Sequence, residues 1–90
     1  MTMKIKEGFI LREVAGTFVI ISTGDDNLDF KGVITVNEVG ALIWRGVEAG
    51  KSTEEIVDKI LSEYDVQRDV ATVDCDEFLQ QLIDKNIIEK

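Results

Sequence analysis

The sequence predicts an α+β fold in which three antiparallel strands are followed by three helices, within a single domain that spans residues 1–90. Two observations carry this prediction. Up to about residue 36 the apolar residues form short β-type runs, whereas after residue 37 they recur at the spacing of an amphipathic helix. Glycine and polar turn formers separate the runs, so each run corresponds to one element.

The N-terminal third is expected to form a β-meander, with strands over residues 9–12, 17–21 and 30–36. Ala15 and Gly16 suit a tight hairpin turn, and the polar segment 23–27 suits a longer one. The second strand is apolar at four successive positions, Phe18 to Ile21, so we expect it at the centre of the sheet. One face of the sheet should meet the helices, and the other is open to a partner or a second copy.

Three amphipathic helices are expected after residue 37. Gly50 can end the first in the left-handed conformation, Ser52 and Glu55 have capping-box spacing at the start of the second, and the third begins near Asp69. Ile87 and Ile88 should hold the end of the chain. The inward-facing residues are Val39, Leu42, Ile43 and Val47 in the first helix, Ile56, Val57, Ile60, Leu61 and Tyr64 in the second, and Cys75, Phe78, Leu79, Leu82 and Ile83 in the third.

The junction ITVNEVGALIW, residues 34–44, passes from strand to helix with almost no loop. Two N-caps are compatible with it, Thr35 as part of a capping box or Asn37, and we prefer Asn37 because it leaves Thr35 in the strand. Gly40 lies inside the helix at a cost of about 1 kcal/mol relative to Ala, so we expect another backbone to approach closely there. Trp44 is expected in the core.

The charge and composition disfavour nucleic acid and membranes as partners. A net charge of −8, from 18 acidic and 10 basic residues, repels phosphate backbones and anionic lipid, although the same charge also keeps a small domain soluble. No apolar run is long enough to span a membrane, and MTMKIKEG at the N-terminus lacks the apolar segment of a signal peptide. The single cysteine, Cys75, cannot form an internal disulfide, which suits the cytoplasm.

Catalytic and metal-binding patterns are missing from the sequence. There is no His, and Cys75 lies on an apolar helix stripe, so we expect a buried thiol rather than a nucleophile. The glycine patterns of phosphate-binding loops are absent, and Asp25, Asp26 and Asp29 lack the ligand spacing of a calcium loop. We therefore expect a protein that is not an enzyme and that needs no metal or cofactor.

The run VNEVGALIW, residues 36–44, resembles the LNxxGxxIW signature of the PqqD family, named for coenzyme PQQ synthesis protein D. GKSTEEIV at 50–57 is similar to the start of the family's second helix, and the likeness continues in register to cover residues 8–89. Members that serve PQQ synthesis tend to carry Leu-Cys-Asp-Gly where this chain has residues 45–50. The departure favours a PqqD-like protein from another peptide pathway.

The resemblance implies a RiPP recognition element, a non-catalytic winged-helix module that binds the leader of a ribosomally made precursor peptide. In that family the leader adds a strand to the third β-strand, in a groove walled by the third helix. The module then presents the peptide to a modifying enzyme, often a radical S-adenosylmethionine (radical SAM) protein.

The third strand is also expected to be a sheet edge with unpaired backbone groups, which strand addition would satisfy. Asp74 and Lys85 flank the apolar stripe of the third helix on one side and Thr72, Asp76 and Gln80 on the other, and the sequence leaves open which flank faces the edge. Val73 lies opposite the stripe, either by chance or as a contact. The predicted peptide-binding residues are Gly32, Val33, Ile34, Thr35, Thr72, Val73, Asp76 and Gln80.

The sheet together with the second and third helices predicts a winged helix-turn-helix, and two other functions are compatible with this architecture. A winged-helix transcription regulator would place the third helix in the major groove, but residues 69–84 hold five acidic side chains and no Lys or Arg, which disfavours contact with phosphates. A homodimerisation module would use an apolar outer sheet face that includes Val19 and Ile21.

Overall fold

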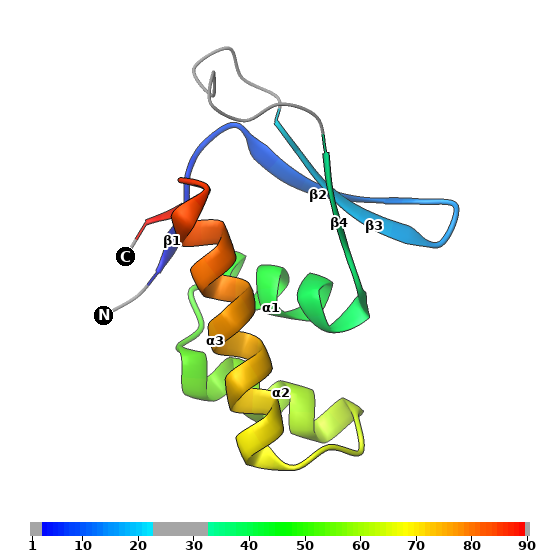
Figure 1. Ribbon diagram of the computed structural model, residues 1–90, viewed down its shortest axis with the longest axis vertical. Helices are drawn as coiled ribbons and strands as arrows, with labels where there is room; N and C mark the ends of the chain where they lie inside the picture. The colour runs from blue at the N-terminus through cyan, green and yellow to red at the C-terminus, as the bar shows by residue number, and fades with distance from the viewer. Residues whose placement is uncertain (1–2, 23–32, 90) are drawn as a thin grey trace.

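The computed structural model describes residues 3–22 and 33–89. Strands β2, β3 and β4 form an antiparallel sheet in that order, and helices α1, α2 and α3 lie together on one side of it (Figure 1). The predicted α+β fold of three antiparallel strands followed by three helices is therefore confirmed. The elements are β1 (Lys4–Ile5), β2 (Phe9–Val14), β3 (Thr17–Ser22), β4 (Val33–Val36), α1 (Glu38–Glu48), α2 (Thr53–Glu63), α3 (Arg68–Asp84) and β5 (Ile88–Glu89).

The sheet has β3 at its centre, as predicted. Ala15 and Gly16, with φ of 53° and 80°, form the two-residue turn of the β2–β3 hairpin. Ile20 of β3 is paired with Leu11 of β2 and Ile34 of β4, and its side chain is fully buried. The part of the third predicted strand before Val33 lies outside the described residues.

The two faces of the sheet follow the alternation of side chains along each strand. Phe9, Ile20 and Val36 belong to the buried core that the helices cover. Their neighbours in β3 and β4 point the other way, so Val33 is 59% exposed and Val19 is half-buried. Strand β4 therefore presents an apolar side chain on each face.

Local capping signals set the ends of α1 and α2. Asn37 is the N-cap of α1, with its side-chain Oδ1 accepting from the Gly40 N–H at 2.8 Å, so the preferred N-cap is confirmed. Gly50, with φ of 75°, ends that helix in a Schellman motif, in which the Lys51 N–H donates to the Gly46 carbonyl. The predicted capping box of Ser52 and Glu55 opens α2.

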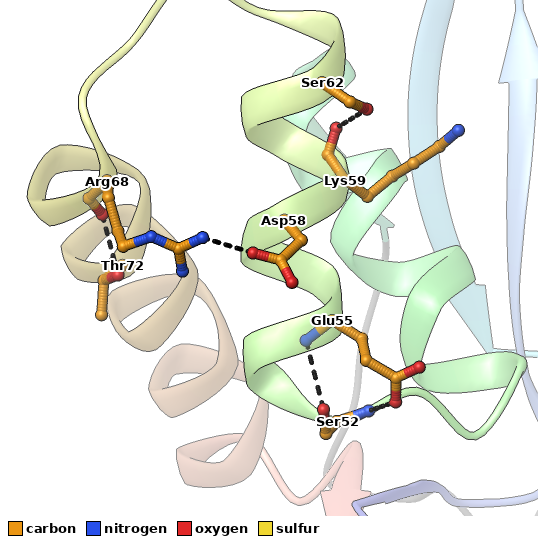
Figure 2. A network of polar contacts seen from close by, with 7 residues as sticks. All are labelled: Ser52, Glu55, Asp58, Lys59, Ser62, Arg68 and Thr72. Carbon is orange, nitrogen blue, oxygen red and sulfur yellow. Dashed lines mark hydrogen bonds and ion pairs between the residues drawn. The ribbon is translucent and has the colours of Figure 1, made fainter.

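Polar contacts along α2 and at the start of α3 lie on the surface of the helical layer (Figure 2). The Ser52 hydroxyl accepts from the Glu55 N–H, and the Glu55 carboxylate accepts from the Ser52 N–H. Arg68, the first residue of α3, forms an ion pair with Asp58 of α2. The ion pair joins α2 to the start of α3, whereas the Ser52–Glu55 contacts lie within the first turn of α2.

Strands β1 and β5 were not predicted from the sequence. They pair antiparallel, Lys4 with Glu89 and Ile5 with Ile88, and so bring the two ends of the described chain together (Figure 1). Each is two residues long, which is too short for a strand period to be seen in the sequence. The pairing explains why Ile87 and Ile88 are buried.

The predicted core is present, with one correction. Trp44 is 0% exposed, and Cys75, Leu79 and Leu82 line the buried face of α3. The close approach at Gly40 involves a side chain and not another backbone, because a Cβ there would lie 2.9 Å from Cε1 of the Phe78 ring. None of the helices in the described part of the chain is long and apolar enough to cross a membrane.

Candidate functional site

Strand β4 is an edge of the sheet. Its four residues pair with β3 on one side, from Phe18 with Val36 to Ile21 with Val33. On its other side no strand is found within residues 3–22 and 33–89. An edge of this kind offers backbone N–H and C=O groups to an added strand.

Two adjoining hollows follow the free side of β4. The first, of about 210 Å³, lies between Ile34, Thr35 and Val36 on one wall and Leu82 and Lys85 of α3 on the other. The second, of about 260 Å³, lies between the start of α1 and α3, and Val39, Ile43, Asp74 and Glu77 line it. Asn37, Phe78 and Gln81 line both, so the hollows are neighbours, and we call the two together the β4–α3 groove.

The groove has an apolar floor. Val36 and Leu82 are buried, and Ile34 and Phe78 are half-buried against the core. The Phe78 ring can lie against α1 because Gly40 has no side chain to displace it. A peptide side chain that entered the groove would therefore meet aliphatic and aromatic surface.

The groove has charged ends of opposite sign. Lys85 lines the hollow beside β4, whereas Asp74 and Glu77 line the hollow beside the start of α1. All three side chains are exposed. The ion pairs in the described part of the chain lie elsewhere and join Lys51 to Glu55, Lys59 to Glu63 and Arg68 to Asp58.

The structure brings only part of the predicted site to the groove. Ile34 and Thr35 line it, Val33 is exposed on the same strand, and Gly32 lies outside the described residues. The predicted residues of α3 do not line either hollow; these are Thr72, Val73, Asp76 and Gln80.

These side chains of α3 have other surroundings. The Thr72 hydroxyl donates to the Arg68 carbonyl at 2.8 Å, and the Gln80 side chain donates to Asp84 at 2.9 Å. Val73 is 53% exposed and Asp76 is also exposed. The helix therefore turns its other flank to the edge strand.

Several groove residues have no binding role predicted from the sequence, and three of them are polar or aromatic. Asn37 was predicted only as a cap, Phe78 only as a core residue, and Gln81 was not singled out. The available signal was helical spacing, because Asp74, Gln81 and Lys85 lie seven and eleven residues apart and so share one face of α3. That face is the flank that begins with Asp74, which the sequence had left as the alternative.

A larger hollow of about 820 Å³ lies away from this edge, where Leu42, Ile56 and Tyr64 of the helical layer face Phe18 of β3. The Arg45 guanidinium stacks over the Phe18 ring at 5.4 Å from its centroid. The Tyr64 hydroxyl donates to Glu38 at 3.3 Å. The pKa of Tyr64 is raised mainly by desolvation and, to a smaller extent, by the negative charge of this carboxylate. Among the described residues that line this space, Phe18 alone belongs to a strand, and that strand, β3, is already paired on both sides.

The described residues contain no group of three or more His, Cys, Asp and Glu side chains that could hold a metal ion. Cys75 is a free thiol on the buried face of α3. Burial, with a smaller contribution from Asp76, raises the pKa of Cys75 to about 11. The thiol is therefore protonated at neutral pH, as expected for a core residue and not for a nucleophile.

The fold and the groove together define a small α+β domain of the winged-helix type with an edge strand beside a helix. Residues 18–88 match the family model for coenzyme PQQ synthesis protein D (PqqD), and the chain belongs to this family. This confirms the resemblance seen in the sequence.

Two solved structures are similar to this chain over most of their length. One is TbiB1 in complex with the TbiA(beta) leader peptide, at 30% identity and a TM-score of 0.77, covering 96% of this chain and 94% of that one. The other is a lasso peptide synthetase B1 complexed with the leader peptide, at 18% identity and a TM-score of 0.81, covering 100% of both chains. The second likeness supports the fold alone. The comparison with curated proteins found no match.

Proposed function

We propose that this protein is a non-catalytic adaptor that binds the leader of a ribosomally made precursor peptide by strand addition to β4. The observation that carries the proposal is that an exposed sheet edge and an apolar groove coincide along β4 and α3. The family supports it, as does the similarity to TbiB1, whose structure holds a leader peptide.

Binding would combine backbone pairing with side-chain insertion. Val33–Val36 can form only a few backbone hydrogen bonds, each contributing about 1 kcal/mol net. Micromolar affinity corresponds to about −8 kcal/mol, so apolar side chains must contribute the remainder. Alternate leader residues would enter the groove over Phe78 and Leu82, and those between them would lie beside Val33 and Thr35 on the outer face.

The adaptor would then present the leader to a modifying enzyme, of the radical SAM type in the pathways that the family resemblance suggests. The segment RGVEAG at 45–50 lacks the Cys-Asp that PQQ-pathway members tend to carry, so we favour another peptide product. We place the complex in the cytoplasm, where the single Cys75 would stay reduced.

We also revise the helical wall of the site. The flank formed by Asp74, Phe78, Gln81 and Lys85 lines the β4–α3 groove, and we propose it in place of Thr72, Val73, Asp76 and Gln80. The strand residues Val33, Ile34 and Thr35 are kept, and Gly32 remains a proposed contact outside the described residues.

Neighbouring glutamines on α3 provide a matched test. Gln81 lines both hollows, whereas Gln80, which is also exposed, lies on the opposite flank. An indole at position 81 would occupy the groove, so Gln81→Trp should weaken leader binding at least about tenfold, a loss of about 1.4 kcal/mol. Gln80→Trp should bind within about twofold of wild type.

The measurement is fluorescence anisotropy with the leader encoded by the short open reading frame nearest to this gene. Thermal unfolding curves for both variants establish that each is folded. Equal binding by the two variants, or a loss confined to Gln80→Trp, would place the peptide somewhere other than the groove.

A further inference from the structure

Charged side chains of opposite sign lie at the two ends of the β4–α3 groove, in a fixed order along its length. Lys85 lies beside Ile34 and Thr35, whereas Asp74 and Glu77 lie beside Val39 at the start of α1. None of these three charges is in an ion pair within the residues that the structure describes. They are therefore available to a bound ligand.

The spacing of these charges matches an extended peptide. Glu77 of α3 and Lys85, the C-cap of that helix, are eight residues apart, which corresponds to about 12 Å along the helix axis. An extended chain advances about 3.4 Å per residue, and side chains on one face recur every second residue. Two side chains four residues apart span about 14 Å on the same face, so this is the interval that reaches both charged ends.

The direction of the added strand sets which charge comes first. The pairs of the existing sheet are antiparallel, and antiparallel pairing is both the more stable and the more common arrangement. A strand antiparallel to β4 would run from the start of α1 towards Val33. Its N-terminal part would face Asp74 and Glu77, and its C-terminal part would face Lys85.

We infer that the groove selects leader segments with the pattern basic–x–apolar–x–acidic, read from N- to C-terminus. The central apolar residue would lie over Phe78, which lines both hollows between the charged ends. This inference rests on the proposed function and specifies its ligand class. The net charge of −8 attracts any basic peptide, so the order of charges, and not their sum, distinguishes a groove ligand.

The test is selection of a displayed library of random 12-residue peptides on three immobilised proteins. These are the wild type, the swap Glu77→Lys with Lys85→Glu, which keeps the net charge, and Asp76→Lys, which changes charge one residue away on the other flank. Wild type and Asp76→Lys should enrich the basic-to-acidic order. The swap should enrich a basic residue at the C-terminal position and lose the preference for a basic residue at the N-terminal position, where Asp74 remains beside the introduced cation. Exchanging the two charges in a selected peptide should weaken its binding to wild type about three- to tenfold.

Selected peptides with no charge order, or with the same order on the swapped protein, would overturn this inference while leaving strand addition intact. Failure to select any peptide would instead count against the proposed function itself. Should the swap unfold, Lys85→Gln is the milder variant. Lys85→Gln is expected to lose the preference for an acidic residue at the C-terminal position of the peptide and to keep the preference for a basic residue at the N-terminal position. An unchanged preference at both positions would also overturn the inference.

Discussion

Two glycines of α1 have close neighbours on different sides of the helix. A Cβ at Gly40 would meet the far edge of the Phe78 ring at 2.9 Å and Cβ of Val36 at 3.2 Å. A Cβ at Gly46 would meet Cγ1 of the buried Ile56 at 2.6 Å. The ring can swing away into the groove, whereas the branched core side chain is held close to its own backbone.

Gly40→Ala and Gly46→Ala should therefore have different effects. In Gly40→Ala the gain in helix propensity, about 1 kcal/mol, offsets the crowding, so the free energy of unfolding should stay within about 1 kcal/mol of wild type. Its displaced Phe78 ring should nevertheless weaken leader binding. Gly46→Ala should lose about 1–3 kcal/mol of stability and bind normally once folded. Urea unfolding measures the change in stability, and anisotropy titrations measure the change in leader affinity. Equal losses of affinity in the two variants would contradict the assignment of Phe78 to the peptide-binding groove.

Such contacts lie beyond sequence analysis. The cost of glycine within a helix indicated a close approach at Gly40, but its partner Phe78 is 38 positions further along the chain. Gly46 was not singled out, because the clash with Ile56 depends on the angle at which α1 and α2 pack.

At the scale of elements, local chemistry decides where the helices begin and end. The start of α2 depends on the reciprocal hydrogen bonds between Ser52 and Glu55. These two bonds are predictable because the two residues have the sequence spacing of a capping box. The pKa of Glu55 lies below its ordinary value of 4.5, mainly because its carboxylate accepts a hydrogen bond from the Ser52 backbone N–H. The Ser52 side chain lowers this pKa further. Ionised Glu55 is thus favoured in the folded state.

Glu55→Gln should accordingly lower stability in a pH-dependent way. A carboxyl group whose pKa is lowered by folding stabilises the protein above its unfolded pKa, and this contribution is lost as pH falls through the folded value. The variant should melt at a lower temperature than wild type at pH 7, and the gap should close below about pH 4.5. Melting curves across this range, with Glu54→Gln as the control, check the expectation. A gap as wide at pH 3 as at pH 7 would contradict it.

The elements with local signals were predictable, and those without them were not. The Asn37 cap, the Gly50 terminus and the hairpin turn at Ala15 and Gly16 each rest on a few adjacent residues, and all three were predicted. The pairing of β1 with β5 joins opposite ends of the chain through two residues each, and nothing local indicates it.

At the scale of the whole molecule, the rotation of α3 about its axis decides which of its side chains face the β4–α3 groove. The apolar stripe through Cys75, Leu79 and Leu82 showed which face of α3 is buried. It did not show which neighbouring flank meets β4, since that depends on how α3 packs against α1 and the sheet. The edge strand was thus predictable, whereas the helix residues predicted from the sequence lie on the flank of α3 that does not line the groove.

The distribution of charge over the molecule should also exclude duplex DNA. Asp69, Asp74, Asp76, Glu77 and Asp84 are exposed on α3, and the only basic residue of that helix, Arg68, is paired with Asp58. We expect no binding to a duplex of about 20 base pairs at about 150 mM salt. Electrophoretic mobility shifts test this, and binding that falls steeply with added salt would support a winged-helix regulator instead.

The central claim is that a leader peptide adds to β4 beside the inner flank of α3. Mapping of backbone amide chemical shifts during titration with the leader encoded beside this gene tests it most directly. The largest changes should occur at Val33–Val36 and at Asp74, Phe78, Gln81 and Lys85. Changes concentrated at β2, or around Phe18, Arg45 and Tyr64, while β4 and α3 stay unchanged, would contradict the account.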